Sequence, residues 1–170
     1  TGESTKHGLA LWNGADLIVN KGSTLTITNS GGDSINANNS GTVITVHGKL
    51  VTNANLTNPG KEVISSTGDV YVGKGMYKTS GSITVDAGGV LETGTYINFT
   101  TSGTLTVNGT VTVNTYCTIS GAASANTAYE YGFAPHLYIG GTLTVNGGKI
   151  GDAKNSNGNG VHISGSACVF

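Results

Sequence analysis

The chain is poor in charge, proline and long hydrophobic runs. Only 10% of its 170 residues are charged, and all eight basic residues are lysine. No stretch collects positive charge, so the neutralisation of nucleic-acid phosphates has little support. No apolar run approaches the roughly 18 residues that a membrane-spanning helix needs. We therefore expect neither nucleic-acid binding nor membrane insertion of this segment.

Cysteine is also scarce, with only Cys117 and Cys168 present. In the repeat alignment given below, Cys117 falls with inward-facing residues and Cys168 with outward-facing ones. Two sulfurs on opposite sides of a sheet cannot reach the separation that a disulfide requires, so we expect no bond between them. The absence of an initiator methionine and of a signal-peptide pattern predicts a processed chain or a fragment.

Glycine, threonine and asparagine are abundant, and they recur in a repeated unit. Each copy has a glycine, a polar residue, and then apolar and polar residues in alternation, as in Gly-Thr-Leu-Thr-Val at 103–107. The first two copies carry one extra residue. The copies occupy residues 14–19, 41–46, 68–72, 81–85, 103–107, 141–145 and, more weakly, 165–169.

A corner of asparagine or glycine follows each of the stronger copies, and these residues supply the backbone conformations that a sharp corner needs. A second short alternating run comes after the corner, and a third run precedes several copies, as at 136–139. Three short strands that turn the same way describe one coil of a parallel β-helix, with coils about 4.8 Å apart. The sequence predicts an all-β fold, a right-handed parallel β-helix (β-solenoid) of about six to seven coils that forms a single domain over residues 1–170.

An antiparallel β-sandwich is the alternative fold, because Asn-Gly is also a strong hairpin signal. Residues 121–135 break the alternation, and we expect an irregular insertion near them. Within the regular strands, the residues that we expect to face inward are Leu25, Val43, Ile83, Leu105 and Leu143.

The titratable residues show no catalytic or metal-binding pattern. The nine acidic residues are scattered and the four histidines lack metal-ligand spacing, so neither a glycosidase carboxylate pair nor a metal site is visible. We expect no enzyme activity, no catalytic residue, no metal and no cofactor.

Ring-bearing side chains cluster at one place, in or beside the predicted insertion. Loops on a rigid scaffold often carry binding residues, and aromatic rings offer flat faces to sugars or protein partners. The other interpretation is that these rings pack on the solenoid. The candidate binding residues are Tyr129, Tyr131, Phe133, His136 and Tyr138.

The segments Gly-Gly-Thr-Leu-Thr-Val-Asn-Gly-Gly-Lys-Ile at 140–150 and Asn-Gly-Asn-Gly-Val-His-Ile-Ser-Gly at 157–165 resemble a known kind of repeat. They are similar to the degenerate repeats of adhesin-like bacterial surface proteins, whose right-handed parallel β-helices are related in fold to pectate lyases. The resemblance runs from about residue 14 to residue 170. It implies an extracellular or cell-surface location and a structural or adhesive role.

The resulting hypothesis is an extracellular structural or adhesive module whose partner is a glycan or protein on a cell surface. A carbohydrate-binding or carbohydrate-active β-helix fragment is the first alternative. An ice-binding solenoid is the second, although Asp69, Tyr71 and Ile44 interrupt its Thr-x-Thr ladder. The last repeat stops before its corner, which leaves an unpaired edge. We therefore expect the segment to continue into a longer repeat array or to stack end to end with copies of itself as a filament. The Thr-x-Thr pairs are Thr24/Thr26, Thr104/Thr106, Thr110/Thr112 and Thr142/Thr144.

Overall fold

The structure is a computed structural model, and it describes residues 6–114 together with their side chains. Further along the chain it describes the backbone of the strands alone, within 116–119, 122–126, 130–133, 136–139, 142–146, 149–151, 160–163 and 167–169. Among all these residues, no helix is long and apolar enough to cross a membrane.

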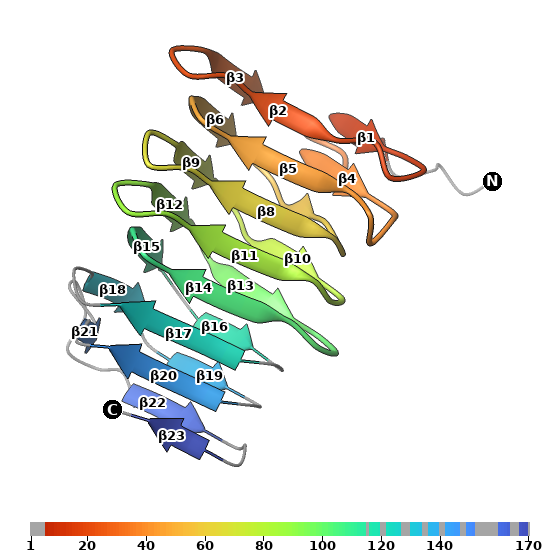
Figure 1. Cartoon of the computed structure of the whole chain (residues 1–170). Helices are drawn as coiled ribbons and strands as arrows, with labels where there is room; N and C mark the ends of the chain where they lie inside the picture. The colour runs from red at the N-terminus through yellow and green to blue at the C-terminus, as the bar shows by residue number, and fades with distance from the viewer. Residues whose placement is uncertain are drawn as a thin grey trace.

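Three parallel sheets run the length of the chain, and successive coils add one strand to each sheet in turn (Figure 1). Sheet A contains β1 (Leu9–Leu11), β4 (Ile35–Ala37), β7 (Leu56–Thr57), β10 (Met76–Lys78), β13 (Tyr96–Phe99), β16 (Tyr116–Ile119), β19 (His136–Ile139) and β22 (Gly160–Ile163). Sheet B contains β2 (Leu17–Val19), β5 (Val43–Val46), β8 (Lys61–Ile64), β11 (Ser82–Val85), β14 (Thr104–Val107), β17 (Ala122–Asn126), β20 (Thr142–Asn146) and β23 (Ala167–Val169). Sheet C contains β3 (Thr24–Ile27), β6 (Lys49–Thr52), β9 (Asp69–Val72), β12 (Val90–Thr93), β15 (Thr110–Val113), β18 (Glu130–Phe133) and β21 (Lys149–Gly151).

This architecture is a parallel β-solenoid, so the predicted fold class is confirmed and the antiparallel sandwich is wrong. Neighbouring strands in each sheet are parallel, for example β11 with β14 and β12 with β15. The described strands make sheets of eight, eight and seven strands. The number of coils therefore differs slightly from the six to seven expected.

The core is a narrow column of aliphatic side chains from all three sheets. Within β11 and β14, Ile83 and Leu105 are buried and directly paired, while Thr84 and Thr106 face outward. Burying one such aliphatic side chain contributes about 1.5–3 kcal/mol. The regular alternation in the sequence therefore reports the inward face correctly in these strands.

The other predicted inward positions had different outcomes. Leu25 is only partly buried, although it packs against the core. The prediction for Val43 was wrong, because Ile44 is 1% exposed and Val43 faces outward. The 41–46 copy has one extra residue, so counting from its glycine shifts the alternation by one. Leu143 lies outside the residues whose side chains are described.

The predicted insertion near 121–135 contains two regular strands. β17 pairs with β14 and β20, and β18 pairs with β15 and β21, so both continue their sheets. The composition of β17, Ala-Ala-Ser-Ala-Asn, hides this strand because it lacks the usual β-branched residues. Residues 121, 127–129, 134 and 135 lie outside the described residues.

The two cysteines occupy different sheets, which changes the reason for expecting no disulfide. Cys117 is in register with the buried Ile97. Cys168 is in register with Leu143, in the column that also contains Leu105, and the side chain of Cys168 lies outside the described residues. The two strands are two coils apart, about 10 Å along the solenoid, which exceeds the usual Cα separation of a disulfide.

Candidate functional site

The corner between β3 and β4 is longer than the corners that follow it in the same position. It covers residues 28–34, whereas the next two corners cover 53–55 and 73–75. Asn29 holds this loop in shape. Its Nδ2 donates to the carbonyls of Lys6 and Asp33, each at 2.8 Å, and its Oδ1 accepts from the Gly31 N–H at 3.3 Å. Such an asparagine-stabilised turn gives the loop a fixed conformation without secondary structure.

Asn53 fastens the loop to the coil below. Its Oδ1 accepts from the Asn29 N–H at 2.8 Å and from the Ser34 hydroxyl at 3.1 Å. Its Nδ2 donates to the Asn29 carbonyl at 3.1 Å. Both ends of the Asn53 amide are therefore used, and they attach the 28–34 loop to the 53–55 corner of the next coil.

A cleft of about 510 Å³ lies between the 28–34 loop and the corners of the next two coils. Three polar groups in it have no hydrogen bond or ion pair within residues 6–114, namely Asn55 Nδ2, Asp33 Oδ1 and Lys74 Nζ. They offer a neutral donor, an anionic acceptor and a cationic donor. The lining residues are Asn29, Ser30, Gly31, Gly32, Asp33, Asn53, Ala54, Asn55 and Lys74.

Tyr96 lies flat on the outer face of sheet A beside the cleft. Its hydroxyl donates to Asn55 Oδ1 at 3.3 Å, which also accepts from the Gly75 N–H at 3.3 Å. The ring covers Gly75 so closely that a Cβ there would lie 2.7 Å from the ring Cδ2. Any larger residue at Gly75 would push the ring away from the sheet. The Tyr96 side chain is thus held by its hydroxyl and by the packing of its ring over Gly75, and Asn55, which lines the cleft, is its hydrogen-bond partner.

The outer face of sheet A continues with further aromatic residues. Tyr77 on β10 is 37% exposed and is in register with Thr57 and Asn98. Tyr96 is in register with Tyr116 on the next strand. Tyr77 therefore lies between two small polar residues, whereas Tyr96 has another aromatic residue at its register position on the next strand, about 4.8 Å away.

The predicted binding cluster is divided between two sheets. His136 is in register with Tyr116, and Tyr138 with Thr118, so both occupy the columns of Tyr96 and Asn98. Tyr131 and Phe133 lie in sheet C, in register with the buried Val111 and Val113. Tyr129 lies outside the described residues. The binding role of these residues stays a prediction.

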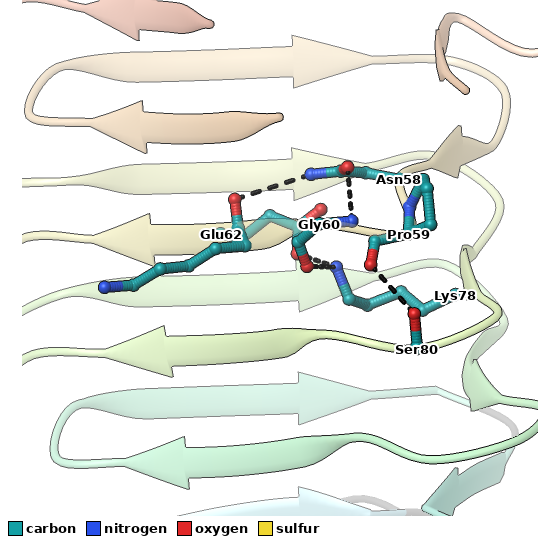
Figure 2. Close-up of polar contacts among 7 residues, drawn as sticks. Asn58, Pro59, Gly60, Glu62, Lys78 and Ser80 are labelled. Carbon is teal, nitrogen blue, oxygen red and sulfur yellow. Dashed lines mark hydrogen bonds and ion pairs between the residues drawn. The ribbon is translucent and has the colours of Figure 1, made fainter. Parts of the chain in front are cut away.

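A second polar cluster is buried in the core. Lys78 and Glu62 form an ion pair, with side chains 0% and 3% exposed. Figure 2 shows Lys78 extending from its strand toward Glu62 and Gly60. Lys78 Nζ also donates to the Gly60 carbonyl at 2.9 Å and lies 5.9 Å from the centre of the Phe99 ring. Asn58, also buried, accepts the Gly60 N–H through Oδ1 at 2.8 Å.

Burial is the main influence on both charged groups. It raises the pKa of Glu62, although Lys78 and the Asn58 amide act in the opposite direction. It lowers the pKa of Lys78, again against the effect of Glu62. Glu62 Oε1 has no hydrogen-bond partner among the described residues. The dry surroundings therefore favour the neutral forms of both groups.

Sequence reasoning found neither the cleft nor the buried cluster. A signal for the cleft existed, because Asn29 and Asn53 both follow sheet C strands. A signal for the cluster existed in the Met-Tyr-Lys strand at 76–78, whose alternation places Lys78 at an inward position. Tyr96 and Asn55 are 41 residues apart, and no local pattern connects them.

Comparison with known proteins adds no family. The chain matches no protein-family model, no curated protein and no solved structure. Within the described residues, no group of three or more histidine, cysteine or acidic side chains could hold a metal ion. The fold that the resemblance to adhesin-like proteins implied is present, whereas membership of such a family has no support.

Proposed function

We propose that the protein is an extracellular adhesive module that binds carbohydrate at the cleft beside Tyr96. The observation that carries this proposal is the combination of unpaired polar groups with a flat aromatic ring at a fixed position. Sugars need both, because their hydroxyls donate and accept hydrogen bonds while their C–H faces pack on aromatic rings. Asp33 would accept from a hydroxyl, and Asn55 and Lys74 would donate to one.

The fixed geometry of the cleft favours binding. Asn29 and Asn53 hold the loop through five hydrogen bonds to backbone atoms, and Asn55 holds Tyr96. A site that is already ordered loses little conformational entropy when a ligand binds. The solenoid would serve as a rigid support that presents this site, and the same support gives the structural part of the proposed role.

Affinity electrophoresis in gels that contain galactomannan, xylan or pectin tests this proposal. We expect at least one of these polysaccharides to retard the protein. Asn55→Asp removes the amide donor while keeping an acceptor for Gly75 and Tyr96, and Lys74→Ala removes an exposed amine. Each variant should weaken retardation roughly tenfold, the usual effect of losing one hydrogen bond to a charged or well-placed group.

The matched control uses two tyrosines on different faces. Tyr96→Leu should abolish retardation, whereas Tyr71→Leu, on the outer face of sheet C, should leave it unchanged. Melting temperatures of both variants show whether the fold survives. Equal loss in both variants, or no retardation of the wild type by any of the polysaccharides, would contradict the cleft as a carbohydrate site.

Ice binding is a second candidate, and the outer face of sheet B favours it. Residues expected to interrupt the threonine ladder are not on this face, since Asp69 and Tyr71 belong to sheet C and Ile44 points into the core. A face of small hydroxyl-bearing side chains at a constant spacing can order water, and ice crystal growth in the presence of the protein tests it. The outward residues Ser82/Thr84 and Thr104/Thr106 are in register with Ala122/Ser124 and Thr142/Thr144 on the two strands that follow, whereas Lys61/Val63 occupy these columns on β8.

A further inference from the structure

The buried cluster brings an amine and a side-chain amide together across two adjacent coils. Thr57 is in register with Tyr77, and the Asn58 N–H donates to the Tyr77 carbonyl at 3.2 Å, so Asn58 and Lys78 follow at neighbouring positions. Both side chains are 0% exposed. Glu62 enters the same space from β8 on sheet B. Figure 2 shows the three side chains converging around Gly60.

Gly60 forms hydrogen bonds with both the Asn58 amide and the Lys78 amine. Its N–H donates to Asn58 Oδ1 at 2.8 Å, and its carbonyl accepts from Lys78 Nζ at 2.9 Å. A backbone N–H on a carbonyl oxygen stabilises the negative charge that develops when a nucleophile attacks the carbonyl carbon. Gly60 therefore binds the Asn58 carbonyl oxygen through its N–H and the Lys78 amine through its carbonyl, which keeps both groups beside one residue.

The protonation states suit the same reaction. An amine attacks a carbonyl only in its neutral form, and burial lowers the pKa of Lys78 toward that form. Burial raises the pKa of Glu62, so its carboxyl can hold the proton and donate it. Glu62 contacts Lys78 directly, and the Asn58 amide acts to lower the pKa of Glu62, so this carboxyl lies near both groups. The leaving nitrogen, Asn58 Nδ2, donates to the Lys61 carbonyl at 3.4 Å.

We propose that Lys78 and Asn58 form an intramolecular isopeptide bond, with Glu62 as the general acid and base. The neutral Nζ attacks Cγ of Asn58, and the Nζ–Cγ bond forms. Glu62 gives its proton to Nδ2 and takes one from Nζ. The Cγ–Nδ2 bond then breaks, and ammonia leaves. Glu62 ends protonated, as it began, so the reaction needs no cofactor, oxidant or other reagent.

The bond joins the coil that contains β7 and β8 to the coil that contains β10. A covalent connection between adjacent coils resists unstacking, which hydrogen bonds between short strands resist less well. This inference does not depend on carbohydrate binding. It is compatible with any role in which the solenoid carries mechanical load.

Mass spectrometry of the full chain, purified and denatured, tests the proposal. We expect the wild-type mass to fall below the sequence mass by one ammonia, and a protease digest to contain a branched peptide that links residues 58 and 78. Asparagine can also lose ammonia by cyclising onto the next backbone nitrogen. Residue 59 is proline and has no N–H, so this side reaction cannot occur at Asn58.

Three variants assign the roles. Lys78→Met and Glu62→Gln should both restore the full mass, and Asn58→Asp should lose water in place of ammonia. Lys74→Met is the matched control, because this lysine is exposed and four residues away, and its mass deficit should remain. The full mass in the wild type would overturn the proposal. A wild-type loss of water with a Lys78–Glu62 link would overturn the assignment of Asn58 as the acceptor.

Discussion

Replacing Lys78 with methionine leaves Glu62 in the core without its partner. Methionine keeps an unbranched side chain in the space but removes the charge and the donor. Glu62 then loses the interaction that opposes the effect of burial, and its pKa rises further. The proper reference is the double variant Glu62→Gln/Lys78→Met, which has neither charge and cannot form the proposed bond.

The sign of the pH dependence follows from proton binding. The pKa of Glu62 is higher in the folded chain than its ordinary value of 4.5, so between these values the unfolded chain binds fewer protons. Stability therefore falls as the pH rises through this window, by roughly tenfold in the folding equilibrium per pH unit. Lys78→Met should therefore lose stability relative to the double variant as the pH rises above 4.5. Removing one partner of a buried ion pair costs roughly 3–5 kcal/mol, which is the scale of the loss that we expect at neutral pH.

Urea denaturation between about pH 4 and about pH 8 measures this effect. Glu62→Gln provides the opposite case, because the pKa of Lys78 is lowered in the folded chain and the unfolded chain then binds more protons. Its stability should rise with pH until the ordinary pKa of lysine, 10.5, is reached. If both single variants have the same pH dependence as the double variant, these two groups are not buried as described.

The remaining predictions concern the core and the outer face of sheet B. Leu105→Ala should destabilise the fold by about 2–5 kcal/mol in urea denaturation, because Leu105 is 1% exposed, whereas Thr104→Ala on the same strand should change stability by less than about 0.5 kcal/mol. Equal effects would mean that the inward face is misplaced. If sheet B binds ice, Thr106→Tyr should abolish the shaping of ice crystals, while Thr112→Tyr at the matching outward position of sheet C should not. Loss of shaping in both variants would exclude sheet B as the specific surface.

The fold could be predicted because it depends on local physics that repeats. Gly-Thr-Leu-Thr-Val places leucine and valine on one face, and the corner after it ends the strand. Most coils repeat this pattern, whereas β17, Ala-Ala-Ser-Ala-Asn, does not. The error at Val43 arose where this pattern has an extra residue. The alternation is reliable within a strand, but its phase depends on the corner before it.

The pairing of coils could not be predicted from local patterns. Thr104/Thr106 and Thr110/Thr112 read alike in the sequence, yet the first pair lies on sheet B and the second on sheet C. Asp69 and Tyr71 were read as interruptions of the threonine ladder because residues from two sheets were taken as one column, whereas the residues that interrupt it on sheet B are Lys61 and Val63. The cleft has the same origin, since Asn55 meets Tyr96 from two coils away.

The buried cluster also explains why polar residues occupy positions that favour aliphatic ones. Lys78 is in register with Phe99, in a column that begins with Leu11 and Ala37. Replacing a buried ion pair with apolar residues is often neutral or stabilising, so stability alone does not account for a lysine, a glutamate and an asparagine at this place. The proposed bond removes this difficulty. It converts the lysine into a neutral amide and leaves Glu62 as a neutral acid, so the finished core contains hydrogen-bonded groups and a covalent link but no buried charge.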